Sequence, residues 1–181
     1  GPRDIDLKQY EHGNRHRHPE VKKEVWKKIF VNDYLGDWIK RFPDLRLQLA
    51  KKLLDRDPSA TDLWRVIKYV EPLQEVAGRK LLEQNLSNTY LREIIYQFPF
   101  LRLVAGKKLL ESDPSNRDLQ AIIEYVEPMR AEAWEKLLEQ VPSNEDLRSI
   151  IRNVEPLQEE AQEILDKMER KWYLFRKIMN F

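Results

Sequence analysis

The residues with the clearest capacity for chemistry are three histidines near the start of the chain. His12, His16 and His18 share one basic stretch with Arg15 and Arg17. Imidazole nitrogens bind transition metals, but a metal site needs ligands that converge on one point and commonly includes a thiolate or carboxylate. Because the two arginines would repel a cation, we interpret this stretch as a solvent-exposed loop and predict no metal site.

Other side chains that catalysis would require are absent from the sequence or have a simpler explanation. There is no cysteine, which excludes a thiol nucleophile, a thiolate metal site and a disulfide framework. The sequence contains no glycine-rich phosphate loop, no nucleophile-elbow serine motif and no zinc-protease helix motif. The adjacent carboxylates Glu159 and Glu160 suit an exposed helix face. We therefore predict that the protein is not an enzyme and uses no cofactor.

The composition is that of an all-α protein with balanced charge. The 181 residues include 32 Lys plus Arg and 31 Asp plus Glu, a formal net charge of +1. Because neither sign dominates, the composition gives no reason to expect bulk duplex nucleic acid as a partner. Only five residues are glycine, whereas the good helix formers Leu, Glu, Lys and Arg recur throughout.

The sequence also bears on where the protein acts. No run approaches the ~18 to 20 apolar residues of a membrane span, and the N-terminus lacks the apolar core of a signal peptide. We therefore expect a soluble, cytoplasmic protein with no membrane span. The initial Gly1-Pro2 resembles the pair left when a protease removes a tag, which indicates a domain taken from a larger protein.

A repeat of 28 residues organises most of the chain. It is clearest in the leucine pairs Leu53-Leu54, Leu81-Leu82, Leu109-Leu110 and Leu137-Leu138. Five units follow one another without a gap from Phe30 to Glu169, with the consensus P-S-N-x-D-L-x-x-I-I-x-Y-V-E-P-L-x-x-x-A-x-x-K-L-L-E-x-D. We assign residues 1–29 to an N-terminal flank with a partly degenerate repeat and a capping helix, residues 30–169 to the repeats, and residues 170–181 to a C-terminal capping helix.

Each unit is predicted to form two short helices. The first begins at a serine N-cap, with Asp three residues later in the capping-box position; these serines are Ser59, Ser115 and Ser143. Its apolar residues follow the i, i+3, i+4, i+7 spacing of one helix face. A proline then ends this helix and is well placed to begin the second. The second helix carries leucines and a recurring small residue that would let another helix approach closely, at Ala77, Ala105, Ala133 and Ala161.

Such short helix pairs cannot stabilise themselves singly, because one apolar stripe has nothing to pack against. Stacked pairs would share a continuous core, so we predict an α-solenoid, a superhelical stack of helical hairpins. Over positions 30–169 the repeats resemble the HEAT and armadillo class, although their unit is shorter than the ~40 residues of that class. The armadillo-like resemblance implies that the second helices line the concave surface.

A second resemblance concerns the segment Lys40-Arg41-Phe42-Pro43-Asp44-Leu45. It is similar to the short, proline-marked helical repeats of mitochondrial transcription-termination-type proteins. That resemblance implies nucleic-acid binding.

The candidate binding surface is the face of the second helices opposite the leucine and alanine stripe. The residues that we assign to partner binding are Leu47, Lys51, Val76, Arg79, Leu103, Val104 and Lys107. Apolar anchors combined with basic residues suit a polypeptide ligand that carries acidic residues. The same positions become acidic in the fourth and fifth units, where they include Glu132, Glu135, Glu159 and Glu160. We therefore predict a non-catalytic interaction, scaffold or regulatory domain of a larger intracellular protein, which binds a protein partner or another domain of its parent chain.

Three alternatives remain open for this surface. The column Lys52, Lys80, Lys108 and Lys136 could pair with the acid three residues later in the same helix, which would only add solubility. The basic residues could form a phosphate track for nucleic acid, with Trp64, Tyr96 and Trp134 as stacking faces, although a backbone-tracking groove should not turn acidic along its length. The domain could also assemble its parent protein through end-to-end contacts or through its tail.

The tail from Lys167 to Phe181 has five basic residues and one acidic residue, a local net charge of +4. An apolar helical face runs through it, formed by Trp172, Phe175, Ile178 and Met179. It could be a basic amphipathic helix that docks on a membrane or an acidic partner. We favour a cap over the last apolar layer, which would otherwise expose Ile150, Ile151 and Leu165.

Overall fold

The computed structural model describes residues 35–180, and the predicted N-terminal flank with its histidines lies outside this range. All regular structure between residues 35 and 180 is helical and no strand occurs there, which confirms the predicted all-α class. The chain divides into two compact units, one ending at Gln84 and the other beginning at Asn85. Within residues 35–180 no helix has both the length and the apolar character needed to cross a membrane.

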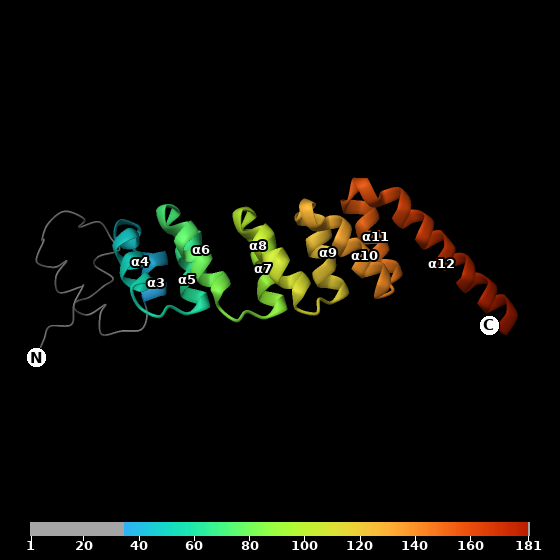
Figure 1. Ribbon diagram of the computed structural model, residues 1–181, viewed down its shortest axis with the longest axis horizontal. Coiled ribbons are helices and arrows are strands. Elements are labelled where there is room, and N and C mark those ends of the chain that lie inside the picture. Colours follow the sequence, from blue (N-terminus) through green and yellow to red (C-terminus); the bar gives the residue numbers. More distant parts are fainter. Residues whose placement is uncertain (1–34, 181) are drawn as a thin grey trace, which may run out of the picture. The chain divides into compact units, whose positions relative to one another are not determined.

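The first unit contains two helix pairs, each joined by a 3-10 turn (Figure 1). The pairs are α3 (Leu35–Arg41), η1 (Pro43–Leu45) and α4 (Arg46–Leu54), then α5 (Ala60–Tyr69), η2 (Glu71–Leu73) and α6 (Gln74–Glu83). Helix α3 packs against α4 and α5, and α5 packs against α6. The first helices of successive pairs therefore contact each other.

The second unit repeats this arrangement with three pairs. They are α7 (Asn88–Gln97), η3 (Pro99–Leu101) and α8 (Arg102–Glu111); α9 (Asn116–Tyr125), η4 (Glu127–Met129) and α10 (Arg130–Glu139); and α11 (Asn144–Asn153), η5 (Glu155–Leu157) and α12 (Gln158–Met179). Helix α9 packs against both α7 and α11. Each pair therefore shares its core with the next pair in the unit.

The serine caps and the buried columns form as the sequence predicts. The hydroxyls of Ser115 and Ser143 accept hydrogen bonds from the backbone N–H of Asp118 and Asp146, at 3.2 and 3.1 Å. Both aspartates accept a bond in return from the serine N–H, which completes the capping boxes of α9 and α11. One leucine column is at most 4% exposed throughout: Leu35, Leu63, Leu91, Leu119 and Leu147. The alanine column Ala77, Ala105, Ala133 and Ala161 is fully buried.

The proline corners differ in one respect from the prediction. Proline is the first or second residue of a 3-10 turn, and the second helix follows that turn. Where proline is the first residue of the turn, its predecessor is extended, as at Phe98 with φ −123° and ψ 90°, because proline disfavours helical geometry in the residue before it. The side chain of the first residue of the second helix then donates a hydrogen bond to a backbone carbonyl of the first helix, which holds the corner together. Such bonds join Arg46 to Ile39, Gln74 to Ile67, Arg102 to Ile95 and Arg130 to Ile123, at 2.7 to 2.8 Å.

Polar side chains also link neighbouring pairs in the second unit. The Arg92 guanidinium of α7 donates to the Asp118 carboxylate of α9 at 2.5 Å, and these residues are 9% and 2% exposed. One repeat later, Gln120 of α9 donates to Asp146 of α11 at 2.6 Å. Each aspartate therefore caps its own helix and holds the helix before it.

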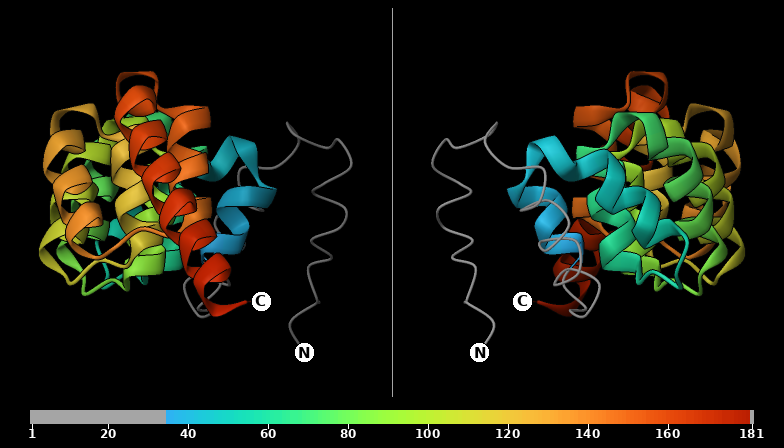
Figure 2. Two further views of the ribbon diagram at one scale, coloured as in Figure 1. Left: turned by 90° about the vertical axis from the view of Figure 1, so that its right-hand side faces the viewer. Right: turned by 90° about the vertical axis from the view of Figure 1, so that its left-hand side faces the viewer.

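The C-terminal tail corrects the prediction of a separate capping helix. Residues 158–179 form one continuous helix, because good helix formers and no proline or glycine fill the positions around residue 170. Its first part already covers the last apolar layer, where Ile150 and Leu165 are 2% and 5% exposed. From residue 169 to 180 every side chain is exposed, so the tail caps nothing in the described part of the chain. Figure 2 shows this red segment running past the helices of its unit.

Candidate functional site

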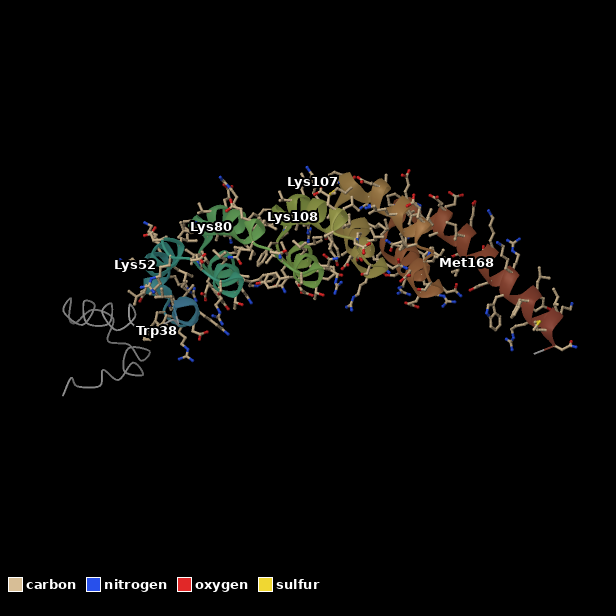
Figure 3. All side chains as sticks on the ribbon, turned by 60° about the horizontal axis from the view of Figure 1, so that its bottom comes forward. Trp38, Lys52, Lys80, Lys107, Lys108 and Met168 are labelled. Carbon is tan, nitrogen blue, oxygen red and sulfur yellow. The ribbon has the colours of Figure 1, made fainter. Side chains whose placement is uncertain are left out.

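Helix α8 presents the densest group of predicted binding residues. Its inner side is held by the fully buried Ala105 and Leu109, which turns Leu103, Val104 and Lys107 outward. Leu103 and Val104 are 56% and 50% exposed, which is high for large aliphatic side chains. Lys107 extends from the same helix (Figure 3) and forms no ion pair within the described residues. The structure therefore brings three of the predicted residues together on one helix face.

Phe100 belongs to this surface, although the sequence analysis missed it. It lies in η3 directly before α8 and is 46% exposed. Together with Leu103, Val104 and Lys107 it follows the i, i+3, i+4, i+7 spacing of one helix face. The signal was present in the sequence: Pro99 stands one residue early in its repeat, which leaves an aromatic residue where the neighbouring repeat has Pro128. We call these four residues, 100, 103, 104 and 107, the α8 patch.

In the first unit, the predicted residues lie on α4 and α6. Leu47 on α4 is 41% exposed and Val76 on α6 is 45% exposed. Lys51 is exposed one turn after Leu47. Arg79 forms an ion pair of 3.6 Å with Glu75 of the same helix, and both side chains are largely exposed. Each helix thus carries one apolar and one basic member of the predicted set.

The charge of the second-helix face changes sign within the second unit. The positions that match the α8 patch are exposed Ala131 and Glu135 on α10 and exposed Glu159 and Glu163 on α12. Lys136 does not pair with the acid three residues later in its helix, which was one of the open alternatives for the lysine column. Its ammonium donates instead to the Leu110 carbonyl at 2.9 Å, which ties α10 to the preceding pair.

The aromatic residues proposed as nucleic-acid stacking faces are not equally accessible. Trp134 is 4% exposed and its indole N–H has no hydrogen-bond partner in residues 35–180, so it offers no stacking face. The equivalent position is also buried in the two preceding repeats, where Gly78 and Gly106 occupy it. A side chain at Gly106 would crowd the Val126 methyls at 3.2 Å, which shows how closely the neighbouring pair approaches.

Tyr96 is half-buried beneath the corner next to α8. Its ring meets that of Tyr125 edge to face, with 5.3 Å between centroids, and Arg102 lies 5.1 Å from the centre of the Tyr125 ring. Burial raises the pKa of the Tyr96 phenol, and Arg92 and Arg117 oppose this effect. These contacts account for the two tyrosines as packing groups, which leaves the α8 patch as the most exposed apolar group on the outer faces of α4, α6, α8 and α10.

The sequence matches no protein-family model, no curated protein and no solved structure. Within residues 35–180, no three His, Cys, Asp or Glu side chains gather where they could hold a metal ion. What the α8 patch can do chemically is bind: it combines two aliphatic groups and an ammonium on α8, the latter without an ion pair among residues 35–180, with one aromatic ring in the adjoining η3 turn. This composition is typical of the apolar centre of an interface beside a charged rim.

Proposed function

We propose that the protein is an armadillo-like helical-repeat domain, an α-solenoid in the sense of the HEAT and armadillo class, that binds a polypeptide without catalysing a reaction. The recurrence of one helix, corner and helix repeat supports the repeat architecture, since the same columns are buried in each repeat and the corner bond forms in four of the five described helix pairs. Repeat proteins of this kind typically present an extended surface to partners.

The observation that carries the proposed function is the exposure of Leu103 and Val104 on α8, at 56% and 50%. Solubility does not explain large aliphatic side chains on the outer face of a helix whose inner face is already well packed. Lys107 beside them favours a ligand that offers acidic residues next to apolar anchors. The proposed partner is thus an acidic segment of another protein or of the parent chain, within a larger cytoplasmic protein.

The exposed faces of α4 and α6 support the same function. Leu47 and Val76 occupy the outward positions of their helices, as Leu103 and Val104 do on α8. A ligand that used these positions would meet an apolar anchor and a basic residue on each helix.

Affinity capture with a matched pair of variants tests this function. Leu103→Asp combined with Lys107→Glu reverses the character of the α8 patch, and Ala131→Asp places the same acid at the equivalent position of α10, beside Glu132 and Glu135. A partner recovered by the wild-type protein and by Ala131→Asp, but lost with the double variant, is the expected result. If the folded double variant recovers the same proteins as the wild type, the α8 patch is not the binding surface.

A binding titration with single-stranded and duplex oligonucleotides tests the nucleic-acid alternative. A phosphate track would give an affinity that falls steeply between about 50 and 200 mM salt and drops further when Lys51, Arg79 and Lys107 are replaced. We expect no such salt-dependent binding, because the second-helix face turns acidic from α10 onward.

A further inference from the structure

The second half of α12 exposes more apolar surface than any other helix in residues 35–180. Trp172, Phe175 and Met179 are 59%, 56% and 51% exposed, and Leu174 and Ile178 beside them are 56% and 78% exposed. Monomeric proteins rarely leave a contiguous apolar patch of this kind uncovered. Solubility therefore does not explain why these apolar side chains are exposed.

These residues continue the stripe by which α12 packs on α11. The stripe, which we call the α12 seam, consists of Ala161, Leu165, Met168, Trp172, Phe175 and Met179. Its spacing alternates between four and three residues, the spacing that keeps apolar side chains facing a neighbouring helix. Ala161 and Leu165 are 0% and 5% exposed where α11 covers them, and Met168 (labelled in Figure 3) is half-buried at the boundary. Beyond Met168, the seam has no covering helix among the described residues.

The charges that flank the seam indicate what such a helix must carry. In helix pairs, residues on either side of the apolar stripe meet opposite charges across the interface and so select the partner. Glu169 occupies a flanking position and accepts a hydrogen bond from Arg148 of α11 at 3.2 Å. The next flanking residues are basic: Lys171 on one side and Arg176 on the other, the latter 4.7 Å from the Trp172 ring. A helix that took over from α11 would therefore present acids where α11 presents Arg148.

The surfaces that residues 35–180 of a second copy would offer do not meet that requirement. Two α12 seams placed face to face would oppose Lys171 and Arg176 with the same basic residues. The α8 patch of another copy contains Lys107, lies beside Lys108 and is basic as well. The acidic face of α10 carries Glu132 and Glu135 but no exposed apolar stripe.

A membrane surface fits less well than a helix. A helix that lies in a lipid interface separates one broad apolar face from one polar face. At 3.6 residues per turn, Tyr173 and Leu174 lie about 100° apart on the half of the helix that faces away from the α12 seam, so the exposed apolar side chains are spread around the helix and not gathered on one broad face. The regular feature of this segment is therefore a narrow seam with basic flanks.

We propose that the α12 seam from Met168 to Met179 docks an amphipathic helix of another protein, apolar along one stripe and acidic on both flanks. This surface is separate from the α8 patch and does not depend on the function proposed for it. Failure of either proposal would leave the other intact.

A peptide made from the helix that covers the first half of the seam provides the probe. It copies residues 142–157, which contain α11, with Arg148→Glu and Arg152→Glu; the matched control peptide keeps both arginines. We expect the acidic peptide to bind the protein at least about tenfold more tightly than the control peptide, because only the acidic one complements Lys171 and Arg176. Higher salt should reduce this difference.

Two neighbouring residues of equal exposure give matched variants. Phe175 and Leu174 are both 56% exposed, but only Phe175 lies on the α12 seam. Phe175→Glu should weaken binding of the acidic peptide by more than about tenfold, as expected for a central aromatic anchor. Leu174→Glu should change it by less than about threefold.

A short peptide is a marginal helix in isolation, so the acidic segment is also joined to residue 181 through a flexible Gly/Ser linker, at an effective concentration of about 1 mM. Protection of Trp172 from acrylamide quenching, absent after Phe175→Glu, is expected in the joined protein. Equal binding of the two peptides, or no protection in the joined protein, overturns the proposal. So does flotation of the protein with anionic vesicles, or dimerisation, if either is abolished by Phe175→Glu.

Discussion

Replacing Asp118 by asparagine tests how the second unit is held together. Asp118 is 2% exposed and binds Arg92, which is 9% exposed. Asparagine keeps the shape of the side chain and an oxygen that can accept from the Ser115 N–H, but it removes the negative charge. The Arg92 guanidinium would then be buried without its counter-charge, and its Nε already has no hydrogen-bond partner in residues 35–180.

The neighbouring repeat supplies a matched control for the size of this effect. Breaking a buried ion pair by removing one partner costs about 3 to 5 kcal/mol. Asp146 occupies the same capping position in α11, but its partners on α9, Gln120 and Asn116, are both neutral. Asp146→Asn should therefore cost only about 1 kcal/mol, the typical value of a cap or neutral hydrogen bond. The difference, about 2 to 4 kcal/mol, measures the buried charge.

Urea unfolding followed by far-UV circular dichroism measures both free energies, since urea is uncharged and does not screen the ion pair. A further variant, Arg92→Met with Asp118→Asn, should recover most of the lost stability, because it removes both charges. Equal losses for Asp118→Asn and Asp146→Asn would refute the reasoning, as would a double variant no more stable than Asp118→Asn alone.

Three further predictions concern single positions in the second unit. Leu109→Ala should lower the free energy of unfolding by about 2 to 5 kcal/mol, because this side chain is fully buried. Leu103→Ala, on the exposed face of the same helix, should lower it by less than about 1 kcal/mol, and similar losses for the two variants would contradict the packing of α8. Val141 has a left-handed backbone with φ 59°, which disfavours a β-branched residue, so Val141→Asn should raise the free energy of unfolding by about 0.5 to 1 kcal/mol. Asp113→Asn, at φ 54°, should change the free energy of unfolding little. If urea unfolding shows a larger gain for Asp113→Asn than for Val141→Asn, backbone strain at Val141 is excluded as the cause. Because burial raises the pKa of Tyr96, the unfolded chain loses the phenol proton at a lower pH than the folded chain does, so stability should fall above about pH 10. Tyr96→Phe should lessen that fall, which urea unfolding at about pH 8 and about pH 11 would measure. An identical loss of stability in the wild type and in Tyr96→Phe would exclude Tyr96 as the cause.

The core and the caps could be predicted because they recur in equivalent positions. Each repeat places a leucine at the position of Leu63, and burial there follows from the helical spacing alone. Ser115 and Ser143 act as N-caps because the hydroxyl and the following aspartate reach backbone groups that are close in sequence. Local chemistry and a repeated apolar column were therefore sufficient for these features.

The polar links between repeats could not be predicted, because their partners vary. The position that holds Arg92 in one repeat holds Gln120 in the next, and only the packing of α9 against both neighbours brings each to an aspartate. Trp134 was assigned to an exposed surface, but the equivalent positions of the repeats are buried. The assignment was wrong because a large aromatic residue stands there where the two preceding repeats have glycine. The tail was assigned a covering role because its apolar residues were visible in the sequence but the extent of α11 was not.

The spacing of the polar links has a consequence for the length of the chain. Arg92 reaches a carboxylate in the next repeat, and the residue 28 positions after Asp118 is Asp146, again an aspartate in a capping box. Deleting residues 114–141 as a block would therefore supply Arg92 with an equivalent counter-charge, and duplicating the block would preserve it. The molecule can thus be shortened or extended, by evolution or by engineering, in whole repeats.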